Sequence, residues 1–234
     1  MKNLRQERIG LVFKTKSGHT FEIVDYYSAN DVIIIFNCGN KITTRWDHIN
    51  NGLVKYPNNK SNCGVGFMGF GSHSSKSSKE SYLRWDKMLS RVYRKECQGY
   101  ENCVVDKRWH NFQTFSDWFY REQDSLKRDV GGKPYCLDKD ILGDGLVYSP
   151  ENCCFVPESL NKIITNTKHA LGAYVNGDKF MVRTRQSGVV GSYGTVVEAN
   201  IVYKKTKIKD ILNTASKECY ERQDVISKLL GKFV

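Results

Sequence analysis

The stretch 135–161, YCLDKDILGDGLVYSPENCCFVPESLN, decides how the middle of this chain folds. A short apolar and aromatic run ends at Asp138, and a Gly-rich turn then leads to the sequence Ser-Pro-Glu-Asn at 149–152. A second apolar run follows, and after it a segment with the composition of a short helix, which carries Asn161. Short apolar runs bounded by turn residues indicate strands. The stretch therefore predicts two short strands joined by a loop and followed by a helix.

Three side chains of this stretch suit phosphodiester chemistry. Hydrolysis needs a metal ion that stabilises the developing charge, a base that activates water and a grip on the nucleic-acid backbone. Asp138 fits the acidic ligand of a divalent metal, Mg²⁺ or Mn²⁺, and Asn152 and Asn161 fit the positions that orient the base and complete the metal site. Taken singly, each of these residues also fits an ordinary turn or cap. The ordered set, with its apolar runs and its turn, is what indicates a catalytic site.

Lys139 stands directly after Asp138, where this chemistry would need a base. An ordinary lysine has a pKa of about 10.4 and cannot accept a proton at neutral pH. Burial could lower that pKa, but the carboxylates of Asp138 and Asp140 would hold the proton in place. Lys139 is therefore interpreted as a phosphate clamp rather than a base. Three histidines could supply an imidazole instead, although nothing in the sequence places them there: His73, His110 and His169.

The charge of the chain favours a polyanionic partner. Its 234 residues carry 36 Lys and Arg against 25 Asp and Glu, a net charge of +11. From position 162 onward there are 13 basic and 6 acidic residues, so the final third holds most of the excess. A clustered basic surplus is typical of nucleic-acid-binding proteins. We expect nucleic acid as the partner, with a basic protein that has no polyanionic partner as the alternative.

The N-terminal half predicts strands and then helices. Residues 1–57 contain β-branched and aromatic runs separated by turn signals, and we expect a small barrel or curled sheet there. The Gly-, Ser- and Asn-rich segment 58–79 predicts a linker. Helices should occupy 80–97 and 109–123, because large apolar residues recur there every three or four positions. Their aromatic stripes are interpreted as core.

The C-terminal part predicts short strands flanked by helices. Thr195 and Glu198 stand at capping-box spacing, so a helix should begin there. The other expected elements are a short helix at 159–166, strands at 172–175, 180–185 and 189–193, and a basic amphipathic helix at 209–230.

The second of these strands has a basic face. Alternation separates its side chains into a basic set and an apolar set: Lys179, Met181, Arg183 and Arg185 against Phe180, Val182 and Thr184. We expect the Lys and Arg of the first set, with Lys168, to contact nucleic acid. An ordinary solvated strand face is the alternative.

The 8 cysteines indicate no disulfide framework, because the N-terminus lacks the apolar run of a secretion signal. A zinc site built from four of them and buried free thiols are the two alternatives; the spacing favours thiols, and zinc is not expected. Those four are Cys97, Cys103, Cys136 and Cys153. No apolar run is long enough to cross a bilayer, so we expect no membrane contact and a cytoplasmic location.

The chain resembles a phage-type family of HNH homing-endonuclease-like proteins whose C-terminal region is similar to the plant apetala/ethylene-response-factor DNA-binding domain. Three stretches carry the resemblance. They are YLRWDKMLSRVY at 82–93 with Tyr100, Cys103, Trp109, Phe112, Phe115 and Trp118; LDKDIL at 137–142 with YSPENC at 148–153 and Asn161; and GSYGT at 191–195 with Glu198, Ala199 and Tyr203. The N-terminal region through 64–69 also looks like the front of such proteins.

The resemblance implies an α+β fold with a ββα-metal (HNH-like) core and a C-terminal three-stranded sheet that packs on a helix. The expected domains are an N-terminal β domain at 1–57, a linker at 58–79, a helical and ββα domain at 80–167, and a basic apetala-like domain at 168–234. It implies double-stranded DNA binding, with Asp138 and Asn152 at the metal and Asn161 in support, in a host bacterial cytoplasm.

Lys139 departs from the family motif, which has a histidine base at that position. Three functions remain open. They are a metal-dependent DNA endonuclease or nickase, a DNA-binding or regulatory protein without cleavage, and a phage accessory protein that holds a protein partner through its N-terminal domain.

Overall fold

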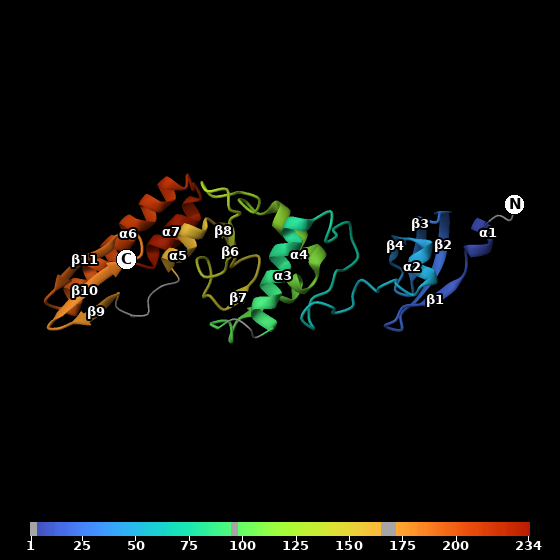
Figure 1. Cartoon of the computed structure of the whole chain (residues 1–234), viewed down its shortest axis with the longest axis horizontal. Coiled ribbons are helices and arrows are strands. Elements are labelled where there is room, and N and C mark those ends of the chain that lie inside the picture. Colours follow the sequence, from blue (N-terminus) through green and yellow to red (C-terminus); the bar gives the residue numbers. More distant parts are fainter. Residues whose placement is uncertain (1–3, 95–97, 165–171) are drawn as a thin grey trace. The chain divides into compact units, whose positions relative to one another are not determined.

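The fold is a mixture of helices and several small sheets, as expected for an α+β chain (Figure 1). The computed structural model describes residues 4–94, 98–164 and 172–234. The chain divides into two compact units, 1–96 with 107–117 and 97–106 with 118–234. No helix in the described ranges combines the length and apolar character that crossing a bilayer requires.

The N-terminal sheet has four antiparallel strands in the order β1-β2-β3-β4. After the short helix α1 (Leu4–Arg8), its elements are β1 (Val12–Lys14), β2 (Thr20–Ser28), β3 (Asp31–Phe36), β4 (Lys41–Thr44) and the helix α2 (Trp46–Asn50). Phe21, Ile23 and Ile34 are fully buried on one face, where Ile49 of α2 and Val54 join them. The prediction of a barrel is wrong: the sheet stays open, with β1 and β4 as its edges. Both edge strands are short, and α2 with the residues after it covers the core that a closed barrel would enclose.

The predicted helices are present with altered ends. They are α3 (Lys79–Tyr93), the 3₁₀ helix η1 (Lys107–His110) and α4 (Phe112–Arg121). Trp109 therefore lies in η1, before α4, although the aromatic stripe placed it in one continuous helix. The indole of Trp85 on α3 donates to the carbonyl of Trp109 over 2.7 Å, and both rings are buried. These aromatic residues form core, as the pattern indicated.

The segment 58–78 packs against η1, α3 and α4, whereas its composition predicted a linker. The amide of Phe67 donates to the carbonyl of His110 over 2.9 Å, and Asn62 donates to Asp86 of α3 over 3.0 Å. Glycine is required in this segment because a Cβ on Gly66 would lie 2.4 Å from the Leu89 side chain. The small residues of this segment allow close packing against the helices. The same composition is typical of flexible linkers, which is why the sequence predicted one here.

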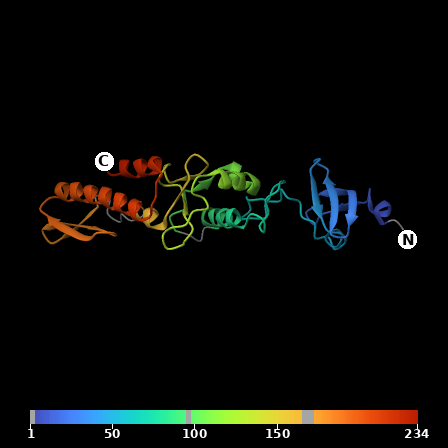
Figure 2. The ribbon, with the colours of Figure 1, turned by 90° about the horizontal axis from the view of Figure 1, so that it is seen from above.

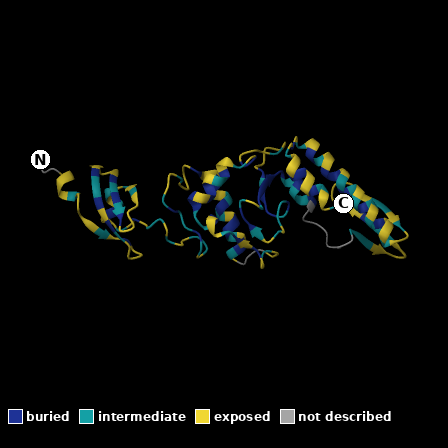
Figure 3. Ribbon diagram, turned by 180° about the vertical axis from the view of Figure 1, so that it is seen from behind, coloured by how far each residue is buried: buried dark blue, intermediate teal, exposed yellow. Residues whose placement is uncertain are grey.

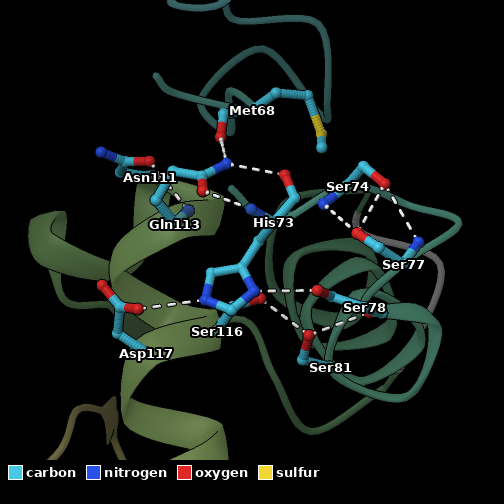
Figure 4. A network of polar contacts seen from close by, with 10 residues as sticks. All are labelled: Met68, His73, Ser74, Ser77, Ser78, Ser81, Asn111, Gln113, Ser116 and Asp117. Atoms are coloured by element: carbon cyan, nitrogen blue, oxygen red, sulfur yellow. Dashed lines mark hydrogen bonds and ion pairs between the residues drawn. The ribbon is translucent and has the colours of Figure 1, made fainter. Parts of the chain in front are cut away.

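A polar network fixes the end of this segment (Figure 4). The Gln113 amide of α4 donates to the carbonyls of Met68 and His73 and accepts from the His73 amide, at 2.8, 3.0 and 2.9 Å. The His73 ring lies between Ser78 Oγ at 2.8 Å and Asp117 Oδ1 at 3.0 Å. His73 therefore has a structural place in the first compact unit, where it joins the start of α3 to α4.

The second unit contains the predicted strand–loop–strand–helix order. Its first elements are β5 (Val104–Val105), β6 (Cys136–Asp138), β7 (Val147–Tyr148), β8 (Cys154–Val156) and α5 (Glu158–Ile164). β6 pairs antiparallel with β8, and β5 pairs parallel with β7. All three residues of β8 are buried, and Phe155 packs on the rings of Trp118 and Phe119. Residues 165 and 166 of the predicted helix lie outside the described residues.

The C-terminal sheet has the strand order β11-β10-β9 and packs one face on α6 (Figures 1 and 2). Its elements are β9 (Ala173–Asn176), β10 (Lys179–Thr184), β11 (Gly188–Tyr193) and α6 (Val196–Lys217). Thr195 caps α6, and the capping box with Glu198 is complete, as the spacing predicted. Val182, Ala199 and Tyr203 form the buried contact between sheet and helix. Figure 3 shows the matching alternation of buried and exposed positions along α6.

The single helix predicted at 209–230 is wrong. α6 continues to Lys217, the chain turns, and a separate helix α7 (Gln223–Gly231) follows. Cys219 takes a left-handed φ of 52° at the turn. The Tyr220 hydroxyl donates to the carbonyl of Phe155 over 3.0 Å, and the Arg222 guanidinium pairs with Glu122 and Asp224, both at 2.6 Å. These contacts with β8, with the end of α4 and within α7 compensate for the helical bonds that the turn interrupts.

Candidate functional site

The three predicted catalytic stations lie on one local unit, in the expected order. Asp138 is the last residue of β6 and pairs across the sheet with Cys154. Asn152 stands two residues before β8, and Asn161 is half-buried on α5. The loop between β6 and β8 is where the side chains of Asp138 and Asn152 make their contacts.

Asp138 shapes this loop. Its side chain is almost enclosed, with a residue exposure of 4%, and its Oδ1 accepts from the amides of Asp140 and Ile141 at 2.9 and 2.8 Å. Burial raises the pKa of Asp138 from 3.8 to about 6, and the nearby charge of Asp140 adds to the rise. The two amide hydrogen bonds and the charge of Lys139 oppose that rise. At neutral pH the carboxylate is therefore charged, and its Oδ1 already accepts the two amide hydrogen bonds that stabilise the turn.

Lys139 is buried and paired. Its Nζ donates to Asp140 Oδ1 over 2.8 Å and lies 5.4 and 5.5 Å from the ring centres of Tyr100 and Tyr148. Burial works to lower the pKa of Lys139, but the hydrogen bond and charge of Asp140 outweigh it and leave the pKa above its usual value. The ammonium therefore keeps its proton and cannot act as a general base. With a residue exposure of 6%, it is also unlike an open phosphate clamp, which was the expectation.

Asn152 supports the same loop from its other end. Its Nδ2 donates to the carbonyl of Val147 over 3.3 Å. The side chain also lies where a Cβ on Gly143 would be, since the two would approach to 2.8 Å. Asp138 and Asn152 therefore both act on the conformation of the loop that joins β6 to β7.

Within residues 4–94, 98–164 and 172–234, no three His, Cys, Asp or Glu side chains converge on a point where an ion could bind. Burial raises the pKa of the Cys153 and Cys154 thiols next to Asp138. His73 and His110 belong to the other compact unit, and Cys97 and His169 lie outside the described residues.

Two of the predicted DNA-contacting residues lie on strand β10. Lys179 and Arg183 are exposed there, while Val182 and Thr184 are buried against α6. The predicted alternation is therefore present at 182–184. Arg185 is also exposed, but it follows the strand in the β10–β11 turn. None of the three cations has an ion-pair partner in the part of the chain that the structure describes. Lys168 lies outside the described residues.

A buried carboxylate that the sequence did not single out holds this strand. Asp210 of α6 has a residue exposure of 3% and accepts from Thr184 Oγ1 and Ser187 Oγ, both at 2.6 Å. These two hydrogen bonds hold the β10–β11 turn, which carries Arg185, against α6. The available signal was an acidic residue at a position of α6 that helical periodicity assigns to the packed face.

Comparison with known proteins adds no relative. The chain matches no protein-family model, no curated protein and no solved structure.

Proposed function

We propose that this chain binds double-stranded DNA through the exposed face of the β9–β11 sheet. The observation that carries the proposal is a set of exposed cations on β10 and in the turn after it that form no ion pair with any described residue: Lys179, Arg183 and Arg185. Exposed side chains of this kind are available to the phosphates of a duplex and to guanine edges in its major groove. The net charge of +11 favours the same partner.

The composition of the third strand limits how much sequence the sheet can read. Val189 pairs with Arg183 across the sheet, and Ser192 pairs with Met181, so β11 brings no charged side chain to this face. Most of the binding energy then comes from phosphate contacts, which carry no sequence information. The proposal is therefore a DNA-binding protein with modest sequence preference.

Removing both arginines should weaken binding and its dependence on salt. In the Arg183→Ala/Arg185→Ala variant, two lost phosphate contacts reduce the slope of log K against log salt by about 1.8. Fluorescence anisotropy with a labelled duplex across a salt series measures this slope. The matched control is Lys14→Ala/Lys41→Ala, which removes the same charge from exposed positions of the N-terminal sheet. A double-arginine variant that behaves like this control would count against the sheet as the contact surface.

The second candidate activity is metal-dependent nicking of DNA, which is the activity of an HNH-type nuclease. The observation in its favour is the order of Asp138, Asn152 and Asn161 on β6, the following loop and α5. The paired state of Lys139 favours the competing possibility, a DNA-binding or regulatory protein of the same descent without cleavage.

A nicking assay on supercoiled plasmid with Mg²⁺ or Mn²⁺ distinguishes these possibilities. If the nuclease candidate is right, the wild-type chain converts supercoiled DNA to open circles and an Asp138→Ala variant does not. Failure of both proteins to nick removes this candidate and leaves DNA binding without cleavage. A variant as active as the wild type would place any catalytic centre elsewhere in the chain.

A further inference from the structure

A shallow hollow lies between helix α7 and the loop that joins β6 to β7. From the loop it is lined by Ile141, Leu142 and Gly143, and from α7 by a face that includes Ser227, Lys228 and Lys232. The α7 residues recur at helical spacing and so form one side of that helix. The sequence reading assigned no role to this side of α7.

Two residues of the loop that line the hollow have amides without an acceptor among the described residues. Because the carboxylate of Asp138 takes the amides of Asp140 and Ile141, the loop turns sharply at this point. The next two amides, of Leu142 and Gly143, donate to no acceptor among the described residues. Successive free amides in a turn are a common means of binding anions.

The wall from α7 supplies positive charge. Lys228 is exposed and forms no ion pair with any described residue. The Nζ of Lys232 donates to the carbonyl of Asp140 over 2.6 Å, which brings its charge to the base of the loop. A neutral acceptor leaves that charge uncompensated.

The one acidic side chain in the lining does not cancel this charge. Asp224 is bound by Arg222 through both of its oxygens, at 3.1 and 2.6 Å. Arg222 also pairs with Glu122 at 2.6 Å, so these three side chains together carry one negative charge. Against the two lysines of the lining, this leaves one positive charge at the hollow.

We propose that this hollow binds one phosphate group of the DNA backbone, through the amides of Leu142 and Gly143 and the ammonium groups of Lys228 and Lys232. The inference rests on the proposed DNA binding and extends it to a second point of contact, apart from the sheet. It also gives Asp138 and Asn152 a role as positioning residues, since they fix the loop that carries the two amides.

The test uses the full chain and the variant Lys228→Gln, which removes one charge and leaves the Lys232 contact in place. The control is Lys209→Gln on the exposed side of α6, about 200° around that helix from the buried Lys207. Two probes are used on each protein: a labelled duplex in a salt series, and inorganic phosphate followed by NMR shifts of the Leu142 and Gly143 amides.

The expected result is a salt slope for Lys228→Gln that is smaller than that of the wild type by about 0.9, as for one lost phosphate contact. The control should keep the wild-type slope. Phosphate should shift the two amides in the wild type, and the shifts should be weaker in Lys228→Gln. Unchanged slope in Lys228→Gln, or amides that do not respond to phosphate, overturns the inference.

These outcomes are separable from failure of the proposed function. A wild-type chain that binds no duplex overturns DNA binding itself. In that case the NMR titration alone decides whether the hollow is an anion site: amide shifts that depend on Lys228 support it, and their absence rejects it.

Discussion

The Asp138→Asn variant should be more stable than the wild-type chain at pH 8, by up to about 3 kcal/mol. The pKa of Asp138 is about 6 in the folded chain, against 3.8 for an ordinary aspartate. Between these two pH values the folded chain holds a proton that the unfolded chain has released. The contribution of Asp138 to stability is therefore fully present below pH 3.8 and is lost as the pH rises to 6. Asparagine cannot ionise, and its Oδ1 can still accept the two loop amides.

Urea denaturation from pH 3.5 to 8, with EDTA present, measures this effect. The difference in the free energy of unfolding between variant and wild type should be small at pH 3.5 and should grow until about pH 6. Asp144→Asn is the matched control, because Asp144 is exposed in the same loop. A difference that does not change with pH would show that Asp138 does not titrate in this range.

The same variant links stability to function. If Asp138→Asn is stabilised at pH 8 and also loses nicking, the carboxylate is retained for chemistry at the expense of stability, as is common in active sites. If it is stabilised and DNA binding is intact, Asp138 serves the conformation of the loop.

Replacing Asp210 with alanine should destabilise the second unit by about 3 kcal/mol, because two buried hydrogen bonds to a charged acceptor are lost. The hydroxyls of Thr184 and Ser187 lose their acceptor. The charge of Asp210 also raises the pKa of Lys207, opposing the burial that lowers it, so its removal makes the buried ammonium more costly. The β10–β11 turn loosens, and DNA affinity should fall with it.

Thermal denaturation and duplex binding measure the two consequences together. Asp178→Ala is the control, since Asp178 is exposed in the turn before β10 and forms no ion pair among the described residues. Combining Asp210→Ala with Thr184→Val in a double-mutant cycle isolates their shared bond. Additive effects of the two changes would contradict the role assigned to it.

Local patterns predicted the C-terminal sheet well and the N-terminal closure poorly. Alternation along 179–184 needs only the period of a strand, and the capping box of Thr195 needs only three residues of spacing. Whether β1 pairs with β4 to close a barrel depends instead on the strand lengths and on which residues cover the core. A short segment of sequence does not show either. The turn at 218–222 was missed for the same reason, because its compensation comes from Phe155 and Glu122, far away in sequence.

The sequence predicted the order of the site residues along the chain, but not the burial or the partners of their side chains. The ββα order of elements follows from apolar runs and turn residues, and it is present. That Lys139 pairs with Asp140 beneath two tyrosine rings depends on where Tyr100 and Tyr148 come to lie. Burial and partners, which set the pKa of a side chain, are properties of the packed chain, and residue types alone do not specify them.

The contacts of Tyr220 with β8 and of Arg222 with Glu122 bear on where this chain could be divided. A boundary at 167/168 looks suitable for recombination, because a basic sheet-and-helix module follows it. Yet that module carries the hydroxyl that binds the Phe155 carbonyl and the guanidinium that pairs with Glu122. A transplanted module would lose both partners, and the recipient scaffold would have to provide a matching carbonyl and carboxylate. Inheritance of the two parts as a pair is the arrangement that avoids this loss.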